Sequence, residues 1–149
     1  MVVMKDTKRY ILDAAEQLFA VRGPHATSLR QIIGRAKVNL AAVHYHFGSK
    51  ELLLRAVMAR RLVPLNAERL ALLEGEERKS ARRVMPLRKV LAALVGPALR
   101  LSRNPQKGGA VFMQLLGRCF MEPDPKIQAM LDNQLQEVAG RFIPALQRA

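Results

Sequence analysis

The stretch Thr27–Lys50, TSLRQIIGRAKVNLAAVHYHFGSK, decides the fold of this chain. Its apolar residues recur at helical spacing, and the Ser28 hydroxyl can cap the free N–H groups of a first short helix. We predict helices over residues 28–36 and 40–47, joined by a tight turn at 37–39. Helix–turn–helix geometry is typical of proteins that lay the second helix in the DNA major groove.

The second helix of this stretch has two different faces. Val43 and Phe47 lie one turn apart, and we expect both to be buried. The opposite face presents residues that could meet a DNA groove: Leu40, Ala41, Ala42, His44 and Tyr45. Small alanine side chains permit close approach to base edges or to a thymine methyl group. This face therefore predicts a surface for duplex DNA.

Polar groups around this helix can donate hydrogen bonds to phosphates. We expect such contacts from Ser28 and Arg30, which open the first short helix, and from His44, Tyr45 and Lys50. Each has an ordinary alternative, since Tyr45 could pack on a neighbouring helix and the cations could be solvated surface charges. Their convergence around one short helix favours phosphate contacts.

The two histidines of this helix do not predict a metal site. His44 and His46 are two residues apart, so they point away from each other on a helix, whereas helical metal pairs are three or four apart. We expect His46 to pack locally and to make a local hydrogen bond. No metal and no cofactor are predicted.

The remaining sequence predicts only helices. A first helix is expected from about Thr7 to Arg22, and a fourth from the Ser49 cap to about Arg60. Pro64 should kink the chain or start a new helix, and the charged run Glu74–Arg83 is expected to be a loop. No strand pattern is found. The fold class is therefore all-α: a three-helix helix–turn–helix domain over 1–54, then a helical bundle over 55–149.

Three longer helices are predicted in the second bundle, over about 86–99, 111–121 and 125–147. Their apolar side chains could line a pocket or form an ordinary core, and leucine, methionine and phenylalanine suit either role. The candidates for an effector pocket are Leu91, Leu94, Val95, Phe112, Met113, Leu116, Phe120 and Met130.

Composition narrows the class of protein. The chain has 25 basic and 12 acidic residues, a net charge of +13, which points to a polyanionic partner. Residues 1–63 hold 11 basic and 4 acidic side chains and residues 64–149 hold 14 and 8, so the basicity is not confined to the motif. One cysteine, Cys119, excludes an internal disulfide. No secretory signal or membrane span is found, so we expect a cytoplasmic protein.

The motif resembles the TetR/AcrR family of transcriptional regulators. The resemblance is carried by Thr27-Ser28-Leu29-Arg30-x-Ile32, Ala36-x-Val38-Asn39 and Val43-x-x-His46-Phe47-Gly48-Ser49-Lys50-Glu51-x-Leu53, with Ile11–Phe19 and Arg22-Gly23 before them. Within the family, Asn39–Glu51 is most similar to a branch that responds to fatty acyl or other lipophilic effectors. Lys37 stands where the family usually has a glycine, and Ile33 where it usually has a small residue.

The resemblance implies roles for the matching positions. Residues 40–47 would be the recognition helix, and Thr27, Ser28, Arg30, Asn39 and Lys50 would join it in contacting DNA. A homodimer would bind a palindromic duplex operator with its recognition helices ~34–36 Å apart. A small lipophilic effector, bound in the C-terminal helices, would release a repressor from that operator.

The family usually has two further helices that form the dimer interface, and this sequence ends about where those would begin. We therefore expect a truncated chain in which Phe142, Ile143 and Leu146 are left exposed.

Two other classes of function are weighed. A basic helical module could bind an anionic membrane surface or an acidic protein, and a salt series comparing random duplex DNA with anionic vesicles would separate this from DNA binding. An enzyme is not expected, because no nucleophile–base pair, carboxylate pair or phosphate loop is recognisable.

Overall fold

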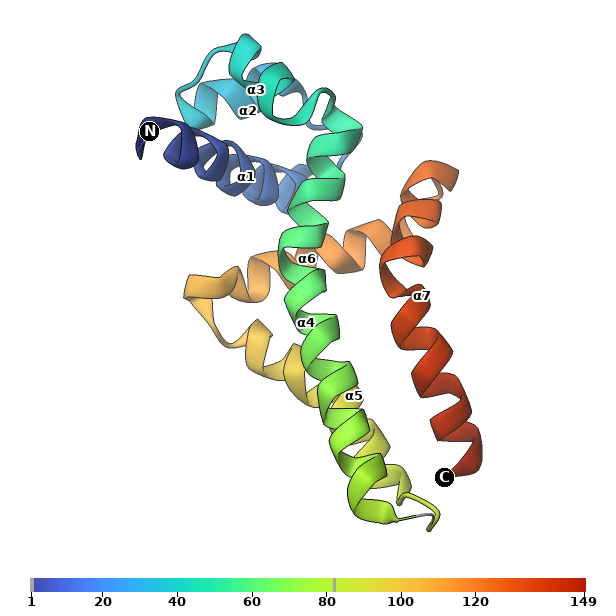
Figure 1. Ribbon diagram of the computed structural model, residues 1–149. Coiled ribbons are helices and arrows are strands. Elements are labelled where there is room, and N and C mark those ends of the chain that lie inside the picture. The colour runs from blue at the N-terminus through green and yellow to red at the C-terminus, as the bar shows by residue number, and fades with distance from the viewer. Residues whose placement is uncertain (1, 82) are drawn as a thin grey trace.

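The computed structural model describes residues 2–81 and 83–149, and the part described contains helices and no strand. Figure 1 shows their arrangement. The elements are α1 (Val2–Arg22), α2 (Leu29–Ala36), α3 (Leu40–Phe47), α4 (Lys50–Ser80), α5 (Leu87–Ser102), the 3-10 helix η1 (Pro105–Lys107), α6 (Gly109–Met121) and α7 (Pro125–Arg148). The predicted all-α fold class is confirmed.

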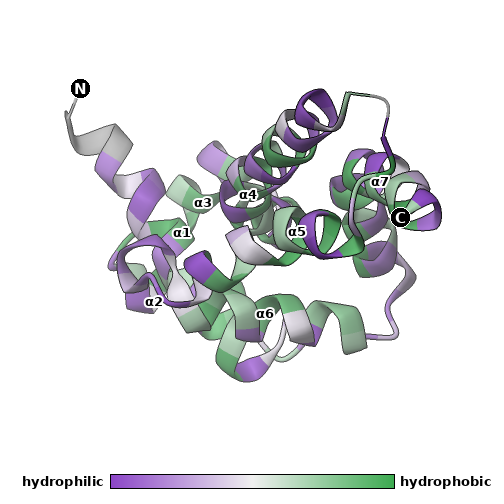
Figure 2. Cartoon of the chain, turned by 90° about the horizontal axis from the view of Figure 1, so that it is seen from below, coloured by the Kyte–Doolittle hydropathy of each residue, from purple (hydrophilic) through white to green (hydrophobic). Residues whose placement is uncertain are grey.

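The helices α1–α3 lie at one end of the molecule, and the long α4 leads away from them (Figure 1). α5 packs against α4, α6 packs against α1, and α7 contacts α4, α5 and α6. Seen from below, α2 is mostly hydrophilic and α6 mostly hydrophobic (Figure 2). This contrast matches their positions, since α2 is a surface helix with Ile32 as its one buried residue and α6 lies against the core.

One main hydrophobic core joins the two parts of the chain. It includes Ile11 and Phe19 of α1, Val57 of α4, Phe112 of α6 and Leu131 of α7, all at most 1% exposed. A second, smaller cluster around Leu73, Val90 and Phe142 fills the far end between α4, α5 and α7. The helix–turn–helix segment is therefore held by the same packing that holds the C-terminal helices.

The helix boundaries near the motif follow the sequence prediction closely. α2 ends at Ala36, α3 spans Leu40–Phe47 and α4 follows the Ser49 cap. α1 begins at Val2, five residues before the predicted start. The Asp124 carboxylate caps α7 by accepting from the Lys126 N–H at 2.7 Å, as its position before Pro125 suggested.

Of the two alternatives expected at Pro64, a kink or the start of a new helix, the second is wrong, because α4 is continuous from Lys50 to Ser80. α4 passes through Pro64 without ending, although the proline cannot supply an N–H to the carbonyl of Arg60. Buried Leu62 and Leu65 on either side pack into the main core, and their burial outweighs the lost bond. A division at residue 54 falls inside this continuous helix.

The loop or linker expected at Glu74–Arg83 was wrong for residues 74–80, because α4 continues to Ser80, and residue 82 lies outside the described residues. Glutamate, arginine, lysine and alanine favour helices, and pairs one turn apart add support. Arg78 donates to Glu74 at 2.8 Å and Lys79 to Glu76 at 2.9 Å. Lys89 of α5 reaches the same Glu76 at 2.7 Å. Charged sequence alone did not reveal these contacts.

Of three C-terminal residues expected to be exposed, two are not. Phe142 is 2% exposed and Leu146 is half-buried against the second core cluster, while Ile143 is 53% exposed. The far ends of α4 and α5 cover Phe142, which the sequence pattern did not foresee because α4 was expected to stop short.

A buried carboxylate links α1 to α4. Glu16 is 3% exposed and accepts hydrogen bonds from the guanidinium groups of Arg60 and Arg61. Gly108, at φ +87°, lies against this cluster, and a Cβ there would come within 2.7 Å of both Glu16 and Arg61. The turn before α6 therefore packs directly on the ion cluster.

α6 also contacts the end of α1 through a side chain. The Arg118 guanidinium donates to the main-chain carbonyls of Ala20 and Val21, the latter at 2.8 Å. Carbonyls in the last turn of a helix lack helical partners, so a cation there satisfies and stabilises them. In the part of the chain that the structure covers, no helix is long and apolar enough to cross a membrane.

Candidate nucleic-acid interface

α2 begins and ends with defined geometry. The Ser28 hydroxyl accepts from the Gln31 N–H at 3.2 Å, and the Gln31 side chain accepts from the Ser28 N–H at 3.0 Å, which together form a capping box. Lys37 ends the helix with φ +55° and ψ +45°. This is the left-handed conformation that favours glycine. Lys37 therefore adopts a backbone conformation that glycine would adopt with less strain.

α3 is fixed at both ends. The Asn39 side-chain oxygen accepts from the Ala42 N–H at 2.8 Å, and Gly48, at φ +82°, donates its N–H to the His44 carbonyl at 3.0 Å. Asn39 therefore uses its side-chain oxygen in the cap and keeps its amide N–H groups available.

The faces of α3 separate as the sequence predicted. Val43 is fully buried and Phe47 is 9% exposed, whereas Tyr45 is 74% exposed and Leu40 is 44% exposed. Ala41 and His44 are exposed as well. The Tyr45 ring meets only the edge of the neighbouring His46 ring, with centroids 5.1 Å apart. Tyr45 is thus mostly accessible to solvent.

Two residues of this face, Ala42 and His44, are less freely available for contacts than the sequence predicted. Ala42 is half-buried and packs against the main core, so its methyl group is only partly available. His44 Nδ1 donates to the Gly48 carbonyl at 2.9 Å, which leaves Nε2 free to meet a partner. The local hydrogen bond expected of His46 belongs to His44 instead, while His46 packs between the rings of Tyr45 and Phe47.

Thr27 has a structural role that the sequence did not indicate. It is fully buried, and its hydroxyl lies 2.8 Å from the Gly23 carbonyl and 3.2 Å from the Leu18 carbonyl. Its side chain therefore holds the end of α1 and cannot reach a phosphate. The expected phosphate contact of Thr27 does not fit this geometry.

Three of the expected phosphate-binding residues are accessible. Ser28 and Arg30 are exposed at the start of α2, and Arg30 has no ion-pair partner among the described residues. Lys50 is half-buried, and its ammonium donates to the Thr27 carbonyl at 3.0 Å. This bond, which sequence reasoning missed, places a cation beside the first turn of α2, where free N–H groups also favour an anion.

The eight candidates for an effector pocket are not brought together. Phe112 lies in the main core with Met113 and Leu116 packed against it, and Leu94 packs on the second cluster. Leu91, Val95 and Phe120 are 42%, 44% and 52% exposed. Met130 alone of the eight lines the cavity described next.

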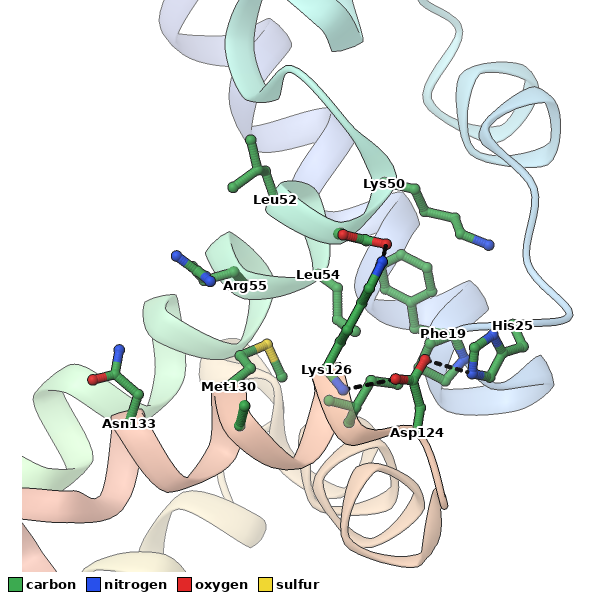
Figure 3. Close-up of a pocket in the computed structure, with 14 residues that line it drawn as sticks. Phe19, His25, Lys50, Leu52, Leu54, Arg55, Asp124, Lys126, Met130 and Asn133 are labelled. Atoms are coloured by element: carbon green, nitrogen blue, oxygen red, sulfur yellow. Dashed lines mark hydrogen bonds and ion pairs between the residues drawn. The ribbon is translucent and has the colours of Figure 1, made fainter.

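A cavity of about 650 Å³ lies between the helix–turn–helix segment and α7; we call it the junction cavity. Its floor is apolar, made by Phe19, Leu54, Ile127 and Met130, and Figure 3 shows charged side chains around it. Lys126 of α7 donates to Glu51 of α4 at 3.0 Å, and this pair holds the pKa of Lys126 above its ordinary value. These contacts join segments far apart in sequence, so no local pattern could have indicated them.

His25 adds a second link across the cavity. Its Nε2 lies 3.0 Å from the Asp124 carboxylate and 3.6 Å from that of Glu122. In residues 2–81 and 83–149, no group of three or more histidine, cysteine or carboxylate side chains could hold a metal ion.

Two protein-family models match the chain. The model for bacterial regulatory proteins of the tetR family matches residues 11–57, and the model described as tetracyclin repressor-like, C-terminal domain, matches residues 92–149. The first covers all of α2 and α3, and the second begins within α5 and includes α6 and α7.

Curated relatives match the chain over part of its length. The HTH-type transcriptional repressor Rv3405c of Mycobacterium tuberculosis is 56% identical over 48 residues, 32% of this chain and 26% of the relative. The uncharacterized HTH-type transcriptional regulator TtgW of Pseudomonas putida is 39% identical over 64 residues, 43% of this chain and 48% of the relative. The HTH-type nicotine-responsive transcriptional repressor HdnoR of Paenarthrobacter nicotinovorans is 37% identical over 84 residues, 55% of this chain and 43% of the relative.

The matched segment spans about a quarter to a half of these relatives' lengths. The capped α2–α3 unit and the helical domain behind it define a helix–turn–helix regulatory protein. The chain belongs to the TetR family of bacterial regulatory proteins.

Proposed function

We propose that this protein is a transcriptional repressor that binds a specific duplex DNA sequence through α2 and α3. The observation that carries the proposal is the exposed face of α3. Tyr45, His44 and Ala41 face solvent on a helix whose opposite side, with Val43, is buried in the core. A short helix anchored in this way can enter a major groove without losing its own packing.

Two cations lie near the start of α2. Arg30 belongs to the first turn of α2, and the Lys50 ammonium donates to the carbonyl of Thr27, just before that helix. These groups and Tyr45 would position the protein on the phosphates, while Leu40 and Ala41 would meet the base edges. Because few of the exposed side chains can form bidentate hydrogen bonds with bases, DNA shape would carry much of the selectivity.

In this proposal the protein acts as a homodimer on a palindromic operator, in the cytoplasm of a bacterium. A small lipophilic effector would weaken the complex by favouring a spacing of recognition helices that no longer fits. Relatives named as nicotine-responsive and as an A-factor receptor support a small-molecule signal, without identifying the one used here.

The test is selection of bound sequences from a random duplex pool, with the mass of each complex measured alongside. The expected result is a palindromic consensus bound by two copies of the chain. A protein that selects no sequence, yet binds anionic vesicles more tightly than duplex DNA across a salt series, would overturn the proposal in favour of a membrane-surface module.

A further inference from the structure

We infer that the junction cavity binds a small amphipathic monoanion and that this ligand weakens the binding of the protein to DNA. The inference rests on the proposed function and assigns its effector a site and a chemical class. The site differs from the one expected from the sequence, because Met130 is the only shared residue.

The cavity has the dimensions of a ligand site. Its volume of about 650 Å³ lies within the ~300–1,000 Å³ typical of small-molecule pockets. Buried Phe19, Leu54, Ile127 and Met130 form the floor, and Leu52, 47% exposed, stands at the rim. Such a surface suits a flat or flexible apolar body, because a methionine side chain adapts its shape to either.

The charges around the cavity select the sign of the ligand. Three cations line it (Lys50, Arg55 and Lys126) against two carboxylates, those of Glu51 and Asp124. Both carboxylates already have partners: Glu51 pairs with Lys126, and Asp124 pairs with His25 and accepts from the Lys126 main chain. The net positive wall therefore favours an anion over a neutral or cationic ligand.

Two of the cations are not neutralised. In the part of the chain that the structure describes, neither Lys50 nor Arg55 forms an ion pair, and they reach out on opposite sides of Lys126 (Figure 3). The Lys126–Glu51 pair is 75% and 69% exposed, so solvent screens it strongly. A carboxylate could thus displace Glu51 from Lys126 at little cost.

The position of the cavity explains how such a ligand would act on DNA binding. Pro24, His25 and Lys50 come from the helix–turn–helix side, and Lys126, Ala129 and Met130 come from α7. Lys50 is also the cation held beside the first turn of α2. An anion in the cavity would attract the Lys50 ammonium group. It would also change the contacts that hold α7 to the DNA-binding segment.

The probe for this test is 2-naphthoate, with 2-naphthamide as its uncharged counterpart of nearly equal shape. Titration calorimetry with the full chain measures both. The charged compound should bind about tenfold more tightly, as a charge-assisted hydrogen bond predicts. Equal affinities, or no binding of either compound, would overturn the inference.

Two variants place the ligand in the cavity. Ala129→Trp fills it from an exposed position on α7, and Arg55→Glu reverses the sign of its wall. Each should abolish or strongly weaken naphthoate binding. Their matched controls are Ala71→Trp and Arg88→Glu, which are exposed and lie outside the cavity lining, and which should bind naphthoate like the wild-type chain. Loss of binding in the controls, or retention in both cavity variants, would contradict the site.

A DNA readout then separates this inference from the proposed function. Saturating naphthoate should weaken binding to the selected duplex about fivefold or more, the lower end of typical allosteric couplings. Unchanged DNA affinity despite naphthoate binding would overturn the regulatory role of the cavity. If no duplex is selected at all, the proposed function fails, while the calorimetry still decides whether the cavity holds an amphipathic anion.

Discussion

The Lys50 ammonium lies 3.0 Å from the main-chain carbonyl oxygen of Thr27 and donates a hydrogen bond to it. This bond ties the first residue of α4 to the residue before the Ser28 cap of α2. An ammonium group has three N–H donors, so two remain for a phosphate. The contact thus orients a cation at a helix start that already favours anions.

Lys50→Ala should weaken binding to every duplex sequence and reduce the slope of log affinity against log salt by about 1, because one phosphate contact is lost. Filter binding or anisotropy over a salt series measures the slope. Lys107→Ala, which removes an exposed cation on η1 far from α3 along the chain, serves as the control. Equal slopes for Lys50→Ala and wild type would contradict the assignment of Lys50.

Tyr45→Ala should weaken DNA binding to all sequences, because the exposed ring and hydroxyl are both removed. Tyr45→Phe separates the two groups: it keeps the ring and removes only a donor, so an intermediate loss is expected. Neither change removes a positive charge, so the number of counterions released by cations should stay nearly the same. The folded stability of both variants should match wild type, since the ring is 74% exposed. An unchanged affinity in Tyr45→Ala would remove α3 from the interface.

Thr27→Val should destabilise the fold by about 1–3 kcal/mol, because the Gly23 and Leu18 carbonyls lose a buried donor. Thr27→Ser, which keeps the hydroxyl, should cost less. Urea unfolding measures both. The salt slope of DNA binding should be the same in the folded variants as in wild type, and a reduced slope would restore Thr27 as a phosphate contact.

Lys37→Gly should stabilise the protein by about 0.5–1 kcal/mol. The left-handed backbone costs a residue with a Cβ about 1–2 kcal/mol, and glycine regains part of this after its larger loss of entropy on folding. Lys37→Ala keeps the Cβ and should bring no such gain. A stability equal to wild type in Lys37→Gly would show that the lysine side chain offsets the strain of its backbone.

The sequence predicted the local geometry of the motif well, since caps and turns depend on neighbouring residues. Ser28 and Ser49 cap the helices that follow them, as predicted, and Asn39, predicted only as a turn residue and DNA contact, caps α3. Contacts between distant segments were not predictable in this way. The bond from Lys50 to Thr27 requires α4 to return to the start of α2, and the pair Lys126–Glu51 requires α7 to pack beside it.

The prediction failed where tertiary packing outweighed a local signal. Pro64 is a strong helix breaker by itself, but the core contacts of Leu62 and Leu65 keep α4 continuous. The sequence also could not show which apolar residues belong to the core and which lie elsewhere. Phe112 is core and Leu91 is exposed, although both have the same helical periodicity.

Glu16→Gln should destabilise the fold by about 2–3 kcal/mol, because it leaves Arg60 and Arg61 without their shared buried carboxylate. The loss should be smaller than the ~3–5 kcal/mol typical of a broken buried pair, since Arg60 also pairs with Asp13 at 2.6 Å. Glu68→Gln breaks the exposed pair with Arg100 and should cost less than about 1 kcal/mol. Equal losses of unfolding free energy in the two variants would refute the special role of Glu16.

Stability should fall between about pH 9 and pH 11 because of Cys119. Burial, and to a smaller extent the charge of Glu122, raises the pKa of this thiol from an ordinary 9.0 to about 11. In this range the unfolded thiol releases its proton while the folded thiol keeps it, so unfolding becomes easier as pH rises. The stabilising contribution is complete below pH 9 and is lost by about pH 11, on the order of 2 kcal/mol.

Cys119→Ala lacks this titration. The difference in unfolding free energy between wild type and the variant should therefore be constant below pH 9 and should shrink above it. Parallel curves for the two proteins up to pH 11 would contradict the burial effect. The same burial should leave the native thiol resistant to alkylation at neutral pH.

Pro64 lies far enough along α4 that a small change in the helix bend there would produce a large displacement at the start of the helix. At ~1.5 Å per residue, the first turn of α4 lies about 21 Å along the helix axis from Pro64. A change of about 10° in the bend at such a proline would swing that first turn by roughly 4 Å. This displacement is close to the ~3.4 Å rise of one base pair. In the proposed repressor, a rotation smaller than most helix kinks would therefore move α3 by about one base step.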